Sequence, residues 1–147
     1  MDYTKQINIL DDAITQVSAY LSYTSSQSDM SKTGEEAKRT VIAILNKISA
    51  SQSTINAIQR VSFESSRQGL FLGGNYNTAD IRDENRCNAY RQSINTIINI
   101  LKQERERLVK EQADEEQKRS KQMAKWTLIF SAIAAICAII SVALAIF

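Results

Sequence analysis

Five arginines and several aromatic residues flank a glycine-rich stretch between residues 60 and 91, and their chemistry suits the binding of an anion. A guanidinium group binds phosphate through two parallel hydrogen bonds, and aromatic rings stack on nucleobases. Every basic residue in this stretch is an arginine. The predicted site for a nucleotide or nucleic-acid ligand consists of Arg60, Arg67, Arg82, Arg86, Arg91, Phe71 and Tyr76.

Two other interpretations of this stretch stay open. Four carboxylates lie among the arginines and reduce the local net charge to +1, so the arginines could form salt bridges within a helix or between subunits. Asp83 and Arg86, three positions apart, would form one such pair. Alternatively, the loop Gly69–Asn77, which is rich in apolar residues, could bind a protein partner.

No constellation typical of catalysis is recognisable in the sequence. There is no histidine, no Gly-x-Ser-x-Gly motif and no phosphate-binding Gly-x-x-x-x-Gly-Lys. The acidic pairs Asp11–Asp12 and Glu35–Glu36 suit solvated helix surfaces, and no group has the spacing of zinc ligands. We therefore expect neither an enzyme nor a bound metal or cofactor.

Three amphipathic helices are expected to position these residues in an all-α fold, an antiparallel helical bundle with heptad seams. Their predicted starts are near the N-terminus, at Ser31 or Thr33, and at Thr78 or Asp80. Proline is absent, as suits long helices. The seams comprise Tyr3, Ile7, Leu10, Ile14, Val17 and Leu21; Ala37, Val41, Ile44, Ile48, Ser51, Ile55 and Ile58; and Cys87, Tyr90, Ile94, Ile97 and Leu101.

The third helix is predicted to continue beyond the bundle without interruption. The apolar seam stops at Val109, and residues 110–125 are almost entirely charged or polar. Residues 1–109 are therefore expected to form a sensor or assembly domain and 110–125 a charged helical stalk. Because the seams contain few large aromatic residues, we expect other subunits of a homo-oligomer, such as a tetramer, to contribute to stability.

Residues 126–147 contain no charge and nothing more polar than threonine or serine. At ~1.5 Å per residue they would extend about 33 Å, which exceeds the ~30 Å hydrocarbon core of a bilayer. The sequence therefore predicts a C-terminal transmembrane helix, 126–147. Basic residues before a span favour the cytoplasmic side, so the expected localisation is a single-pass protein with its N-terminal domain in the cytoplasm. These basic residues are Lys118, Arg119, Lys121 and Lys125.

One face of this segment carries small residues, and the opposite face carries isoleucines. Small residues and hydroxyls allow close packing of helices in lipid, so this face is predicted to join copies of the chain in contact with membrane lipid. It would either hold a dimer together or line a pore. The seam consists of Thr127, Ser131, Ala134, Ala138, Ser141 and Ala145.

This layout resembles small single-span effectors of bacterial anti-phage defence systems, the Hailong-type membrane subunit. The resemblance implies a sensor domain at 1–109, a stalk at 110–125 and a pore-forming span at 126–147, in the bacterial inner membrane. A likeness to SNARE fusion proteins fails, because zippering needs apolar layers up to the membrane and Glu111, Glu115 and Lys118 occupy those positions.

Two functions follow from the sequence. The first is a homo-oligomeric membrane effector whose spans form or gate an ion-conducting pore, controlled by a ligand or partner at the helical domain. The alternative is a tail-anchored scaffold that only localises a partner to the membrane.

Overall fold

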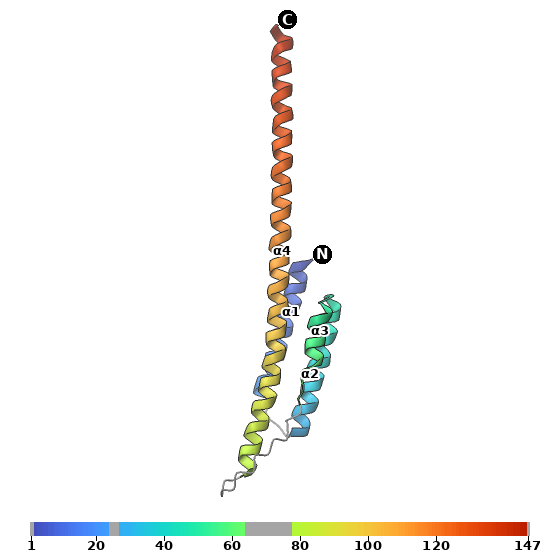
Figure 1. The fold of residues 1–147 in the computed structure, drawn as a ribbon, viewed down its shortest axis with the longest axis vertical. Coiled ribbons are helices and arrows are strands. Elements are labelled where there is room, and N and C mark those ends of the chain that lie inside the picture. The colour runs from blue at the N-terminus through green and yellow to red at the C-terminus, as the bar shows by residue number, and fades with distance from the viewer. Residues whose placement is uncertain (1, 24–26, 64–77, 147) are drawn as a thin grey trace. The chain divides into compact units, whose positions relative to one another are not determined.

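A computed structural model describes residues 2–23, 27–63 and 78–146; of these, the side chains of 27, 28, 78–83, 139 and 142–146 are not described. The secondary structure consists of α1 (Tyr3–Ala19), the 3₁₀ turn η1 (Tyr20–Ser22), α2 (Gln27–Lys47), α3 (Gln52–Gln59) and α4 (Thr78–Ile146). No strand occurs in these described ranges, so the expected all-α class is confirmed. The long C-terminal helix is present as well (Figure 1).

The predicted seams form one hydrophobic core in which α1, α2, α3 and the first part of α4 lie side by side (Figure 1). Each residue of the three seams is buried or half-buried, as the heptad spacing predicted. Burying a leucine or isoleucine side chain contributes about 1.5–3 kcal/mol to the stability of the fold. The largest fully buried side chains are Leu10, Leu45, Ile58, Ile94, Ile97, Leu101 and Val41.

The first helix begins at a polar cap, and its amide and carboxylate side chains connect it to its neighbours. The Asp2 carboxylate accepts a hydrogen bond from the Lys5 N–H at 3.1 Å, which satisfies a donor that the first turn leaves free. Gln6 Nε2 donates to the Ile48 carbonyl at 2.8 Å, so the start of α1 lies beside the end of α2. Asp11 binds Arg105 on α4 through two hydrogen bonds, of 2.6 and 3.2 Å.

The second predicted helix, which was expected to run through Ile58, is divided in two at Ser49. This serine has a φ of 54°, in the left-handed region that usually requires glycine. The Ala50 N–H donates to the Leu45 carbonyl at 2.9 Å and the Ser49 N–H to the Asn46 carbonyl at 3.1 Å, the pairing of a Schellman cap. The Ser51 side chain then caps α3 by accepting from the Thr54 N–H. The break preserves burial of Ile48, Ile55 and Ile58.

The chain divides into two compact units, Met1–Leu108 and Val109–Phe147, and α4 contributes to both. In the first unit, Tyr90, Ile94, Ile97, Ile98 and Leu101 of α4 belong to the core. In the second unit, every side chain that the structure describes from Glu116 onward is exposed. In the first unit α4 is therefore a core helix, and in the second unit its described side chains from Glu116 onward face solvent.

The structure contradicts the predicted transmembrane helix. None of the helices in the described parts of the chain combines the length and the hydropathy that crossing a bilayer requires. Toward the N-terminus this segment is bounded by Lys125 and Lys121, and Thr127, Ser131 and Ser141 interrupt its apolar residues. The side chains of residues 139 and 142–146, and all of residue 147, lie outside the described part of the chain.

The predictions that depend on a transmembrane helix are therefore wrong as well. These are the ion-conducting pore, the tail anchor of the alternative scaffold, the single-pass localisation in a bacterial inner membrane, and the role as a membrane effector. A role in antiviral defence, which is implied by the resemblance alone, stays a prediction.

Candidate functional site

The structure describes only part of the predicted anion site. Arg60 ends α3, where its N–H donates to the Asn56 and Ile58 carbonyls, and its side chain is exposed. Arg91 is exposed on α4, and Arg86 is half-buried and already has an interaction partner. Arg67, Phe71 and Tyr76, the loop Gly69–Asn77 and the side chain of Arg82 lie outside the described residues. The nucleotide and partner site at this loop therefore stays a prediction.

A buried carboxylate joins α4 to the start of α3. Glu104 is 3% exposed and accepts hydrogen bonds from Thr54 Oγ1 at 2.9 Å and from Arg107 Nη2 and Nε at 2.6 and 3.1 Å. The Ser51 N–H donates to it as well. Thr54 Oγ1 in turn lies 2.7 Å from Ser51 Oγ. The carboxylate therefore satisfies donors at the N-terminus of α3, where the helix dipole favours a negative charge.

The pKa of Glu104 reflects a balance between burial and these donors. Burial alone raises the pKa, because it disfavours the charged form. The hydrogen bonds from Arg107 and Thr54, the positive charge of Arg107 and the Ser51 N–H outweigh it, and the net result is a lowered pKa. Glu104 is thus ionised at neutral pH and serves to hold α3 in register with α4.

Three aromatic rings form a layer at the other end of this unit. The Phe63 and Tyr90 ring centroids are 5.8 Å apart, and those of Tyr23 and Tyr90 are 6.5 Å apart, both in tilted arrangements that favour aromatic contact. Lys38 Nζ donates to the Val61 carbonyl at 2.8 Å and Ser93 Oγ to the Ser62 carbonyl at 2.7 Å. These two bonds hold the segment that carries Phe63 between α2 and α4.

The Tyr90 hydroxyl is buried, and no described group forms a hydrogen bond with it. Burial, together with the neighbouring phenols of Tyr20 and Tyr23, raises the pKa of Tyr90 to about 12. A buried hydroxyl without a partner costs on the order of 1–3 kcal/mol. The packing of the core alone therefore does not explain why the Tyr90 hydroxyl is buried.

Substitution of this residue tests that cost. Tyr90→Phe keeps the ring and removes the unpaired hydroxyl, so we expect the free energy of unfolding to rise by about 1 kcal/mol. Urea unfolding of the full chain, followed by circular dichroism, measures the change. Tyr3→Phe, at a half-buried residue of α1 that has an interaction partner, is the contrasting control and should not gain stability. A loss of more than about 1 kcal/mol in Tyr90→Phe would mean that the hydroxyl has a partner, such as a water molecule.

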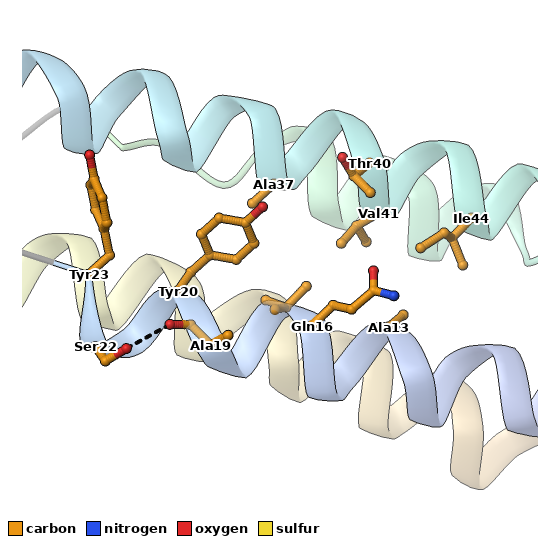
Figure 2. A pocket seen from close by; sticks show the side chains of 11 residues that line it. Ala13, Gln16, Ala19, Tyr20, Ser22, Tyr23, Ala37, Thr40, Val41 and Ile44 are labelled. Atoms are coloured by element: carbon orange, nitrogen blue, oxygen red, sulfur yellow. Dashed lines mark hydrogen bonds between the residues drawn. The ribbon is translucent and has the colours of Figure 1, made fainter.

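An open groove of about 710 Å³ lies between α1 with η1 on one side and α2 on the other (Figure 2). Figure 2 shows Tyr20 reaching from η1 toward Ala37 on α2. Thr40, Val41 and Ile44 of α2 face Ala13 and Gln16 of α1 across the groove. The lining includes three small residues, Ala13, Ala19 and Ala37, and larger side chains there would occupy more of the space.

The second unit presents a different kind of surface, formed by large apolar side chains. A helix in water rarely exposes so many of them without a partner. Those more than two-fifths exposed between positions 123 and 140 are Met123, Trp126, Leu128, Ile129, Phe130, Ile133, Ile136 and Ile140.

The predicted small-residue seam lies on the same helix. The Thr127 hydroxyl donates to the Met123 carbonyl at 3.0 Å and the Ser141 hydroxyl to the Cys137 carbonyl at 2.9 Å, so both donor hydrogens are used within α4. Ser131, Ala134 and Ala138 are exposed, and the side chain of Ala145 is not described. Whether this seam forms a contact stays a prediction.

Known proteins offer no template for these sites. No family model, curated protein or solved structure matches this chain. The resemblance to Hailong-type effectors therefore stays a prediction.

Sequence reasoning missed Glu104, the aromatic layer and the groove. For Glu104 a signal existed, because it stands at a seam position between Leu101 and Leu108 where an apolar residue was expected. A carboxylate at such a position indicates a buried polar partner. For the groove, the alanines of its lining carry no comparable signal.

Proposed function

We propose that the chain functions through assembly rather than catalysis: copies join along the C-terminal part of α4 and thereby gather their Met1–Leu108 units. The observation that carries this proposal is the exposed apolar surface between Met123 and Ile140. Burying one isoleucine contributes about 1.5–3 kcal/mol, so several together provide a large driving force for association.

The spacing of the apolar residues supports a second copy of the same helix as the occupant of this surface. Trp126, Ile129, Ile133, Ile136 and Ile140 recur at spacings of 3, 4, 3 and 4, which are the a and d positions of a heptad. These five side chains are between 45% and 57% exposed in the single chain. A seam of this kind is self-complementary, because each copy supplies both knobs and holes.

The residue types at these positions favour a particular number of copies. Isoleucine at both a and d shifts parallel coiled coils from dimers toward trimers and tetramers. Upstream, the same register places Gln122, Arg119 and Glu115 at core positions. Association is therefore expected to be confined to the part of α4 that follows Lys125, and to contain three or four copies.

The decisive experiment compares two faces of α4 in the full chain. Ile133→Asp places a charge in the proposed seam and is expected to weaken self-association about a hundredfold, because an apolar contact is lost and a carboxylate is desolvated in every copy. Leu128→Asp is the matched control, since Leu128 is exposed and outside the seam. Light scattering measures the mass of each variant after purification.

A third variant separates this proposal from the small-residue seam. Ala134→Leu alters that seam and is expected to leave the mass unchanged. In a chain whose native cysteines are replaced by serine, Trp126→Cys should form disulfides between copies if the helices are parallel. A monomeric wild-type chain would overturn the proposal, and loss of assembly in Ala134→Leu but not in Ile133→Asp would assign the contact to the small residues.

A further inference from the structure

The groove between α1 and α2 has the size and lining of a small-molecule site, independently of the proposed assembly. Its volume of about 710 Å³ lies within the range of roughly 300–1,000 Å³ that is typical of ligand pockets. It is formed by residues of the Met1–Leu108 unit alone, from α1, η1 and α2.

The described lining carries no charged side chain. Apolar walls come from Ala13, Val17, Ala37, Val41 and Ile44, with Tyr20 and Tyr23 at one end (Figure 2). An anion or cation would lose its hydration here without gaining an opposite charge, which is costly. The lining therefore selects an uncharged ligand.

Several polar groups line the groove. The hydroxyls of Tyr20 and Tyr23 and the amide of Gln16 border it. Thr40 Oγ1 donates to the Glu36 carbonyl at 3.0 Å, which leaves its lone pairs available to a donor. A ligand with one or two hydrogen-bonding groups would satisfy them.

A separate observation concerns Tyr90, a neighbour of one lining residue. The Tyr90 ring contacts Tyr23, a lining residue, and the buried Tyr90 hydroxyl has no described partner. The phenols of Tyr20 and Tyr23 are close enough to raise the pKa of Tyr90. A buried hydroxyl without a partner calls for a physical explanation, and its ring neighbour Tyr23 belongs to the lining of the groove.

We infer that this groove binds an uncharged, largely apolar small molecule with an aromatic ring and a hydrogen-bonding group. The ring would pack against Tyr20 in an offset or edge-to-face contact. Its polar group would lie among Gln16, Thr40 and the tyrosine hydroxyls. Such a ligand fits between two helices and would contribute to how α1 and η1 pack on α2.

Two probes of equal size test the charge selectivity on the full-length chain. Naphthalenemethanol is uncharged, and naphthoate carries the same ring with a carboxylate. Ligand-observed nuclear magnetic resonance measures the dissociation constant of each. We expect naphthalenemethanol to bind at least roughly tenfold more tightly than naphthoate, a difference expected from desolvating an unpaired charge.

Substitutions locate the binding. Thr40→Phe fills the groove from α2, and Thr96→Phe is its matched control: both threonines are exposed on helices, and both hydroxyls donate to the carbonyl four residues earlier. Thr40→Phe should weaken naphthalenemethanol binding at least roughly tenfold, and Thr96→Phe should not. Because naphthalenemethanol could also adhere to the apolar face of the second unit, only binding that Thr40→Phe removes counts in support.

A second groove-filling variant guards against misfolding. Ala19→Leu fills the groove from the α1 side, and Ala19 is exposed, so the substitution leaves the core unchanged. Both variants should retain the circular dichroism and unfolding transition of the wild type. Absence of naphthalenemethanol binding to the wild type, or equal affinity in Ala19→Leu and the wild type, would overturn the inference.

Discussion

Arg107→Ala is expected to lower the free energy of unfolding of the full chain by about 2–3 kcal/mol. The substitution leaves the Glu104 carboxylate buried without its charged partner, and an unpaired buried charge is strongly destabilising. The value lies below that of a fully buried pair, because the Arg107 side chain is 40% exposed and water partly screens its charge. Urea unfolding followed by the near-ultraviolet circular dichroism of the tyrosines measures it.

A paired replacement separates this mechanism from a general loss of packing. In Glu104→Leu with Arg107→Leu both charges are absent, and the apolar side chains can pack beside Leu101 and Leu108. Most of the lost stability should return, because a buried ion pair contributes little over an apolar pair of similar size. Thr54 keeps a partner in Ser51 Oγ. If the double variant is less stable than Arg107→Ala, the buried pair is not what the single variant disturbs.

The same carboxylate predicts how stability depends on pH. Its pKa in the folded chain is below the ordinary value of 4.5, so its contribution is complete above that pH and is lost as the pH falls through the folded pKa. Glu104→Gln removes the titration and keeps an acceptor for Thr54. Below pH 4.5 the stability of the wild type should therefore fall more steeply than that of Glu104→Gln, which repeated urea unfolding at several pH values measures.

Much of the core could be predicted from spacing alone. Leu10, Val41, Ile58 and Leu101 stand on heptad seams, and a helix buries the residues of one face whatever its exact neighbours are. The break at Ser49 is harder to predict from the sequence. It depends on two backbone hydrogen bonds and on a serine in the left-handed region, and the sequence marks it only by three serines with weak helical propensity.

The sites depend on contacts between segments that are distant in the sequence, and heptad spacing gives no information about such contacts. Glu104 lies 50 residues from Thr54, and the groove is lined by residues of two separate helices, with Ala37 of α2 opposite Tyr20 and Ala13 of α1 opposite Ile44 (Figure 2). The composition of the second unit indicates its apolar surface, but the prediction that this segment spans a bilayer is wrong. Composition shows that 126–140 needs a partner; it does not show whether that partner is lipid or another copy of the helix.

Substitution of Gly34 by alanine is expected to have the second large effect on stability. The sign of this effect is opposite to the one that helix propensity predicts. Alanine is favoured over glycine inside a helix by about 1 kcal/mol, so Gly34→Ala in α2 would ordinarily stabilise the chain. Here a Cβ at position 34 would overlap Cγ, Cδ1 and Cε1 of the Phe63 ring. The ring has little room to move, because its other neighbours include Tyr90 and the segment that carries it is held by Lys38 and Ser93. We expect a loss of about 1–3 kcal/mol.

Two further variants establish the cause of this loss. Ala43→Gly, at an exposed position of the same helix, measures the propensity difference without any contact and should destabilise by about 1 kcal/mol. Phe63→Leu removes the ring that the new methyl group would meet. In the Phe63→Leu background Gly34→Ala should be neutral or stabilising, so the two substitutions should show a coupling energy of about 1–3 kcal/mol. Additive effects in urea unfolding would mean that Gly34 is required for the backbone of α2 and not for the aromatic layer between α2 and α4.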